Sequence, residues 1–331
     1  MKKKRPVLQD VADRVGITKM TVSRYLRNAD QVSEALRGRI AQALDELGYI
    51  PNRAPDILSN ATSRAIGVLL PSLTNQVFAD VLRGFEAVTD QSGYQTMLGH
   101  FGYSAAKEEQ QIRLLLGWNI DGLILTERTH TAASLRMIET AGIPVVEMMD
   151  SVSPYLQHAV GFDNAEAARQ MTQCIIRQGH QHVVYLGARL DERTLLKQQG
   201  YEQAMREAGL MPHSIMREGA SSYSMGGELL REARQRFPAT DSLLCTNDDL
   251  AIGAMFECQR QGLRIPQQMA IAGFHGHNIT CVTNPPLATV ITPREEMGRQ
   301  AALLLLARLQ GKPVSDQPVN LGFTLSMGGS I

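Results

Sequence analysis

The sequence predicts an all-α N-terminal segment followed by a larger α/β part with two lobes. Apolar residues recur at helical spacing from Leu8 to Leu47, with a tight turn at Gly16. From Ser63 onward, short apolar runs alternate with helical patterns, which is typical of parallel α/β architecture. A chain of 331 residues with 44% hydrophobic content is long enough to bury more than one core.

Positive charge is concentrated at the N-terminus. The formal net charge of the whole chain is zero, so any affinity for nucleic acid has to come from a local cluster of basic residues. Between Lys2 and Arg27, only Asp10 and Asp13 oppose the basic residues Lys2, Lys3, Lys4, Arg5, Arg14, Lys19, Arg24 and Arg27.

The sequence predicts a cytoplasmic protein, because its basic start does not continue as a secretory signal. The basic start is followed by polar and acidic residues from Pro6 to Asp13, where a secretory signal needs an apolar run. The apolar run Leu303 to Leu306 is too short to span a bilayer. We expect reduced, buried thiols, because neither close pairing nor metal-ligand spacing relates Cys174, Cys245, Cys258 and Cys281.

Two short helices are predicted around the turn at Gly16. The first spans Leu8 to Val15, and Thr18 is a plausible N-cap of the second. The second helix carries an inward stripe of Val22, Tyr25 and Leu26. Its opposite face presents Lys19, Met20, Ser23, Arg24 and Arg27.

A third helix completes the N-terminal segment. It begins after Ser33, carries an apolar stripe, and ends at Gly48 as a C-cap. So short a turn between the first two helices predicts a helix-turn-helix arrangement, in which the second helix enters the DNA major groove. The stripe that covers the first two helices consists of Leu36, Ile40, Leu44 and Leu47.

The larger part is predicted to contain parallel sheets with intervening helices. Ligands in such folds bind beside the carboxyl ends of the strands. The apolar runs that predict strands are Ile66 to Leu70, Gln95 to Leu98, Gly122 to Leu125, Val145 to Met148, Val183 to Leu186, Ser242 to Cys245 and Met269 to Ala272.

Three motifs in order resemble the signatures of the LacI/GalR repressor family: Leu8-Gln-Asp-Val-Ala12, Thr21-Val-Ser-Arg24 and Gly48-Tyr-Ile-Pro-Asn-Arg53. The resemblance implies a helix-turn-helix DNA-binding headpiece over residues 1–51 and a hinge helix with linker over 52–63. Residues 64–331 then form an effector-binding and dimerisation core like a periplasmic sugar-binding protein. Chain crossings between its lobes are expected near residues 160 and 290.

The same resemblance assigns the DNA contacts. Lys19 and Met20 occupy the positions that choose the operator sequence, and Arg24 a position at or near a base. Asn52 to Leu58 resembles the hinge helix, whose leucine, here Leu58, enters the minor groove. Pro55 departs from the alanine usual in the hinge. Side chains better suited to phosphates are Thr18, Ser23, Asn28, Ser33 and the arm from Lys2 to Arg5.

Effector contacts are carried over in the same way. Sugar-responsive relatives have arginine at the position of Lys197 and aspartate at the position of His275. At His275, this chain therefore has a side chain that can carry a positive charge where those relatives have an anion. Convergence of Lys197, Arg193 and His275 favours a carboxylate. The family positions are Ser72, Val77, Phe78, Arg193, Lys197, Asn247, His275 and Thr292, and hydroxyl-binding groups are Asn247, Thr292, Glu147 and Asp150.

A sugar acid satisfies both halves of this prediction, and the resemblance to gluconate-responsive members of the family names gluconate. We expect a homodimer on palindromic operator DNA, because no heptad-bearing tail like that of tetrameric relatives follows Leu325. We expect gluconate to act as an inducer that releases the operator, because a catabolic signal should release its own genes. A ligand that acts as a corepressor, and a different sugar or sugar acid, stay open as alternatives.

Other functions have weaker support. His180-Gln-His182 and His275-Gly-His277 lack the further ligands of a metal site, so no metal is expected. Phosphate-cradling loops and a nucleophile elbow are absent from the sequence, so we expect no cofactor and no catalytic residue. There are two competing hypotheses. A sugar-acid enzyme with a fused DNA-binding head should present a catalytic base or nucleophile, and none is visible in the sequence. An architectural DNA binder, whose large domain only dimerises, would not need a polar cleft.

Overall fold

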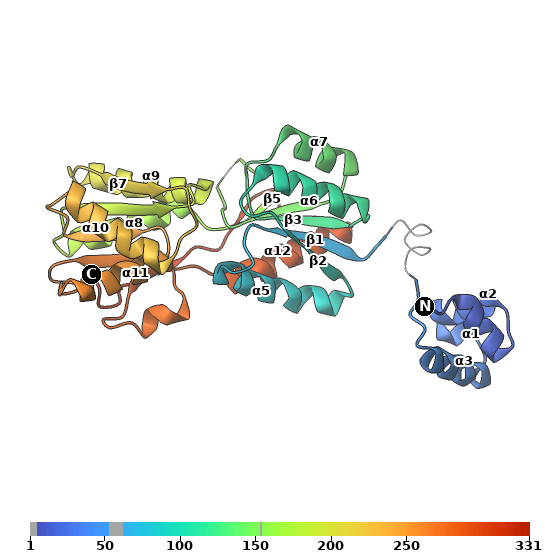
Figure 1. Cartoon of the computed structure of the whole chain (residues 1–331). Coiled ribbons are helices and arrows are strands. Elements are labelled where there is room, and N and C mark those ends of the chain that lie inside the picture. The colour runs from blue at the N-terminus through green and yellow to red at the C-terminus, as the bar shows by residue number, and fades with distance from the viewer. Residues whose placement is uncertain (1–4, 53–61, 153) are drawn as a thin grey trace. The chain divides into compact units, whose positions relative to one another are not determined.

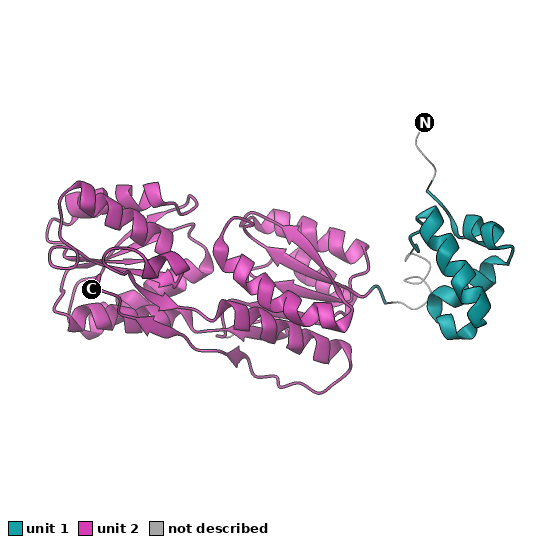
Figure 2. Cartoon of the chain, turned by 90° about the horizontal axis from the view of Figure 1, so that it is seen from below, with its two compact units in different colours: residues 1–63 teal, residues 64–331 magenta. Residues whose placement is uncertain are grey.

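The computed structural model describes residues 5–52, 62–152 and 154–331 (Figure 1). The chain divides into two compact units, Met1–Ser63 and Arg64–Ile331, which Figure 2 colours separately. The predicted hinge residues Pro55 and Leu58 lie outside the described residues, as do Lys2, Lys3 and Lys4.

The described part of the first unit contains three α-helices around a small core. Gly16 ends α1 in the left-handed conformation with φ 74°, which a residue without Cβ adopts at little cost. Val11, Val22 and Ile40, one from each α-helix, are completely buried. The predicted helix-turn-helix is therefore confirmed. Its elements are α1 (Leu8–Val15), α2 (Lys19–Arg27), the 3₁₀ turn η1 (Ala29–Gln31) and α3 (Glu34–Leu47).

The described residues of the second unit form two sheets, and each is the centre of one lobe. The sheet of the first lobe has the order β11-β5-β4-β3-β1-β2 and is parallel throughout. Alternating strands and helices favour this pairing. Its strands are β1 (Ala65–Leu70), β2 (Gln95–His100), β3 (Gly122–Leu125), β4 (Val145–Met148), β5 (His158–Gly161) and β11 (Val319–Asn320).

The sheet of the second lobe has the order β12-β10-β9-β8-β6-β7. Only the edge strand β12 runs antiparallel to its neighbour within the described sheet. Its strands are β6 (Val183–Ala188), β7 (His213–Arg217), β8 (Ser242–Cys245), β9 (Ala270–His275), β10 (Ala288–Ile291) and β12 (Thr324–Ser326).

Helices cover both sheets. In the first lobe α6 and α7 lie on one side of the sheet, and α5 and α12 on the other (Figure 1). In the second lobe α8 packs against α9, and α10 against α11. The helices are α5 (Gln76–Ser92), α6 (Ala105–Gly117), α7 (Ala132–Ala141), α8 (Asn164–Arg177), α9 (Glu192–Glu207), α10 (Tyr223–Arg236), α11 (Asp248–Arg260) and α12 (Arg294–Leu309), with a short 3₁₀ turn η2 (Asn278–Cys281).

The chain passes between the lobes at three places. It leaves the first sheet after Gly161 and returns after Ile291, close to the crossings expected near 160 and 290. A third crossing, which the sequence did not predict, joins β11 to β12. The two-lobed α/β prediction is confirmed. The lobes are connected by three segments of the chain, and such connections are where a hinge movement between lobes takes place.

In the described part of the chain, no helix combines the length and the apolar character needed to cross a membrane. The four cysteines are free. Cys245 and Cys258 are buried as expected, whereas Cys174 is half-buried. Cys281 is exposed, because it ends the short turn η2 at the surface.

Candidate DNA-reading surface and effector pocket

The helix α2 presents the side chains that the sequence assigned to the operator. Thr18 is its N-cap, and its hydroxyl accepts a hydrogen bond of 3.3 Å from the Thr21 N–H. Lys19 and Arg24 are exposed, and Met20 is 69% exposed. The apolar surface of Met20 is therefore largely accessible for contact.

The proposed phosphate contacts lie around this helix. Asn28 is exposed, and its side-chain oxygen accepts from the Asp30 N–H at 2.9 Å, so its amide NH₂ remains available. Ser23 is half-buried, and Ser33 is exposed at the N-cap position of α3 without a side-chain capping bond to the described residues. Asn52 is exposed at the end of the described headpiece.

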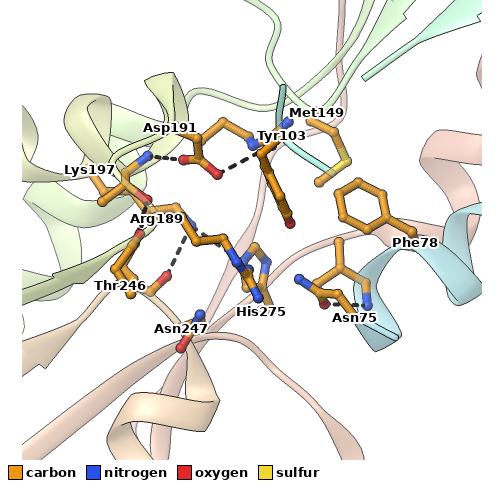
Figure 3. Close-up of a pocket in the computed structure, with 14 residues that line it drawn as sticks. Asn75, Phe78, Tyr103, Met149, Arg189, Asp191, Lys197, Thr246, Asn247 and His275 are labelled. Carbon is orange, nitrogen blue, oxygen red and sulfur yellow. Dashed lines mark hydrogen bonds and ion pairs between the residues drawn. The ribbon is translucent and has the colours of Figure 1, made fainter. Parts of the chain in front are cut away.

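A polar pocket lies between the two lobes of the second unit (Figure 3). It encloses about 370 Å³ outside the protein atoms, including space open to solvent. Most residues that line it lie at or just after the carboxyl ends of β2, β4, β6, β8 and β9, which is where ligands bind in parallel α/β folds. The first lobe contributes Asn75, Val77, Phe78, Tyr103 and Met149, and the second contributes Ala188, Arg189, Asp191, Arg193, Thr194, Lys197, Thr246, Asn247 and His275.

The predicted effector residues divide into two groups. The pocket brings together Val77, Phe78, Arg193, Lys197, Asn247 and His275. Ser72 and Thr292 are not among the lining residues. Ser72 accepts from the Asn75 N–H at 3.1 Å in the turn before α5, and the Thr292 hydroxyl donates to the His275 carbonyl at 3.4 Å.

Glu147 faces the interior of the first lobe, so its assignment to the pocket is corrected. One of its carboxylate oxygens lies 3.5 Å from Nε2 of His130, and the other accepts from the Leu156 N–H. Nδ1 of His130 lies 2.8 Å from Glu108. Asp150 is also absent from the polar pocket; it pairs with Arg128 at 3.0 Å.

Arg193 reaches the pocket with its charge already offset. Its guanidinium donates to Glu127 of the first lobe at 2.7 Å and to Asp191 at 3.4 Å, and also to the Thr126 carbonyl. Burial opposes its charge, but the Glu127 and Asp191 carboxylates hold the pKa of Arg193 above its ordinary value. Arg193 therefore joins the two lobes instead of offering a free cation.

Lys197 and His275 form a second buried pair. Burial lowers the pKa of Lys197 to about 7, and its ammonium donates to the Thr246 carbonyl at 3.1 Å. It also lies 3.4 Å from Nε2 of His275. Burial and the neighbouring Lys197 charge lower the pKa of His275 well below its ordinary value. The trio meets as predicted, but it carries less positive charge than its residue types suggest.

Backbone strain is concentrated around the pocket. Tyr103 (φ 60°), Met149 (φ 86°), Arg189 (φ 73°) and His275 (φ 104°) all adopt positive φ angles and all line it. Each such conformation costs free energy for a residue other than glycine, and such residues cluster at ligand sites. Of these, Tyr103, Met149 and Arg189 were not predicted, because the sequence shows a residue type but not a strained backbone.

A helix-turn-helix unit joined to a two-lobed ligand-binding core defines a ligand-responsive transcriptional regulator. Residues 7–52 match the family model for bacterial regulatory proteins of the lacI family. Residues 63–318 match the model for periplasmic binding proteins and the sugar binding domain of the LacI family. The chain belongs to the LacI family and is a transcriptional repressor of this type.

Relatives support the assignment along the whole chain. The HTH-type transcriptional regulator GntR of Escherichia coli K12 is 70% identical, with 100% of each chain covered. The HTH-type transcriptional regulator IdnR of the same strain is 42% identical, again with 100% of each covered. A LacI family transcriptional regulator from Silicibacter pomeroyi has a similar structure, with a TM-score of 0.92, 32% identity, and coverage of 98% of this chain and 99% of its own.

Proposed function

We propose that this repressor controls genes for gluconate uptake and catabolism, binds a near-palindromic operator as a homodimer, and is released by gluconate. The polar pocket between the lobes is the observation that carries this proposal. It offers amide and basic side chains to a small ligand, including Asn75, Asn247 and Arg189. Full-length similarity to the regulator GntR supports the same effector class.

The two-fold symmetry of the dimer would place two copies of α2 into two half-sites. Lys19, Met20 and Arg24 then face base edges, while Thr18, Ser23, Asn28 and Ser33 contact phosphates. Asn52 and Leu58 belong to the hinge region in this proposal, with Leu58 as the minor-groove residue. The protein acts in the cytoplasm, without catalytic turnover and without a cofactor.

Release follows from linkage between the two binding events. A ligand that prefers the lobe arrangement incompatible with operator binding must weaken DNA affinity, and the operator must weaken ligand affinity by the same free energy. Contacts between the lobes, such as Arg193 with Glu127, are the groups whose geometry a ligand in this pocket would change.

Fluorescence anisotropy of a labelled palindromic operator at fixed salt tests the proposal. Gluconate should release the operator, while glucose and the neutral polyol glucitol should not. Tightening by gluconate would establish corepression, and absence of any response would remove gluconate as the effector. Lys197→Glu should abolish the response, because it places an anion in the pocket; an unchanged response would remove Lys197 from the ligand site.

A further inference from the structure

We propose that Arg189 binds the carboxylate of the effector and makes the pocket specific for acids over neutral polyols. This inference rests on the proposed function, since it assigns the charged group of the same ligand. Arg189 follows β6 in the second lobe and lines the pocket together with Asn247 and Tyr103 (Figure 3).

The other basic side chains of the described pocket are already engaged. Arg193 is paired with Glu127 at 2.7 Å and Asp191 at 3.4 Å. Lys197 is bonded to the Thr246 carbonyl and lies 3.9 Å above the Phe274 ring. The charge of Arg193 is already matched by two carboxylates, and burial lowers the pKa of Lys197 to about 7, so neither side chain is the free cation that would select an acid.

Arg189 differs in having a guanidinium with unused donors. Its Nε is buried and has no hydrogen-bond partner among the described residues. The Asp249 carboxylate is near enough for the Arg189 charge to oppose the rise of the Asp249 pKa, but the two side chains form no direct ion pair in the described structure. A buried donor without an acceptor carries a desolvation cost that a ligand oxygen would remove. The unpaired Nε is therefore an independent indication of a ligand at this position.

The surroundings hold the guanidinium in place. Its central carbon lies 5.0 Å from the centre of the Tyr103 ring, which comes from the first lobe. Stacking on an aromatic face leaves the donors in the guanidinium plane free for a carboxylate, which matches their planar, two-point geometry. A carboxylate bound here would thus lie beside a contact that joins the lobes.

The backbone of this segment indicates that the side chain is needed. Arg189 and Leu190 have successive positive φ angles of 73° and 51°, and the Arg189 N–H donates to the Gly219 carbonyl at 3.0 Å. Glycine would adopt this conformation without strain, yet the position carries an arginine that faces the pocket. The strain is consistent with a side chain retained for ligand contact.

Hydroxyl groups of the same ligand have partners near Arg189. When the Lys197 ammonium donates to Nε2 of His275, the proton of the neutral imidazole is on Nδ1, which is buried and unpartnered in the described structure. Asn247 and Asn75 supply further polar groups. The ligand class is a short polyhydroxy carboxylate, with its acid group at Arg189 and its hydroxyls toward His275 and Asn247.

Isothermal titration of the full-length protein with gluconate and with glucitol tests the assignment. Arg189→Gln should lower gluconate affinity about 10- to 100-fold and leave glucitol affinity unchanged, so that preference for the acid is lost. Arg189→Lys should retain part of the preference, because an ammonium keeps the charge without the two-point geometry. Arg217→Gln is the matched control, since Arg217 ends β7 at the surface of the same lobe and pairs with Glu232.

Folding is checked with Arg189→Gly, which removes the side chain and relieves the positive φ. Its thermal midpoint should not fall, while its preference for gluconate should be lost like that of Arg189→Gln. A preference for gluconate that survives in Arg189→Gln overturns the assignment, most plainly if Lys197→Met abolishes it instead. If the wild type binds no gluconate, the proposed function fails, and the role of Arg189 is then tested with a panel of other sugar acids. A preference for an acid over its neutral polyol that disappears in Arg189→Gln supports the assignment. A preference that persists in Arg189→Gln contradicts it.

Discussion

The Arg193 guanidinium at the start of α9 lies 2.7 Å from the Glu127 carboxylate, which follows β3 in the opposite lobe. The two side chains are 10% and 16% exposed, so solvent screens their attraction little. This ion pair joins the two lobes beside the pocket, which Arg193 lines. Its loss is expected to affect both the stability of the core and the closure of the lobes.

Glu127→Gln should destabilise the core by about 2 to 3 kcal/mol, because it leaves a buried guanidinium with Asp191 as its remaining acidic partner in the described structure. This loss lies at or below the lower limit of the usual range of about 3 to 5 kcal/mol for a broken buried pair, since burial already raises the pKa of Glu127 and disfavours its charged form. Urea unfolding measures the change. Glu296→Gln breaks an exposed pair with Arg299 and should cost less than about 1 kcal/mol; equal losses would refute the role of burial.

His130 should make the stability of the core depend on pH. Burial opposes its charge, but the hydrogen bond to Glu108 and the neighbouring Glu147 carboxylate, 3.5 Å away, raise the pKa of His130 from 6.5 to about 9. A folded-state pKa above the unfolded value gives stability that is complete below pH 6.5 and lost as pH rises through about 9. The shift corresponds to about 3 kcal/mol.

The measurement compares the wild type with His130→Gln by urea unfolding between about pH 6 and about pH 9. The comparison is needed because Lys197, with its pKa lowered to about 7, contributes in the opposite direction: its stability is lost as pH falls. The stability difference between the two proteins should shrink as pH rises. A difference that stays constant over this interval would show that His130 carries no extra proton in the folded state.

Close packing of α5 against α12 requires glycine at their crossing. A Cβ at Gly84 would overlap the Glu295 carbonyl, and a Cβ at Gly298 would overlap the Val81 carbonyl. Gly84→Ala should destabilise the first lobe by about 2 kcal/mol, because backbone atoms cannot move aside as a flexible side chain can. Gly117→Ala, at the end of α6 with open space around it, should not destabilise. Thermal unfolding of both variants measures the effect. Equal midpoints for the two variants would contradict the requirement for glycine where α5 packs against α12.

Lys19→Ala should change which operator sequences are preferred, since Lys19 lies exposed at the first position of α2. Loss of one base contact costs about 1 to 3 kcal/mol on the preferred base and little on others. Binding to an operator library at fixed salt measures this. A uniform loss on all sequences, with a salt dependence reduced by about one unit, would assign Lys19 to a phosphate.

Much of the fold is predictable because burial periodicity is local. The strands β3, β4 and β8 begin and end where their apolar runs do, and α1 spans the predicted residues Leu8–Val15. The strands β5, β7, β10, β11 and β12 were not predicted. Several are short or partly exposed edge strands, and β7 (His213–Arg217) carries polar residues at both ends, so their apolar signal is weak.

The site is less predictable than the fold, because pairing across the lobes is not visible in the sequence. Arg193 and Lys197 could be placed by family position, but their acidic and carbonyl partners come from distant segments. Glu147 was a reasonable hydroxyl-binding candidate until the structure placed it against His130. Arg189 had no motif to mark it; the signals that identify it are an unpaired Nε and a positive φ angle.

The most direct test of the account is the affinity for gluconate with and without the operator, measured by titration calorimetry on the same protein at the same salt concentration. Ligand-controlled release predicts that saturating operator weakens gluconate binding by the same factor by which saturating gluconate weakens operator binding. Gluconate affinity that is identical in the free and operator-bound protein would contradict the account.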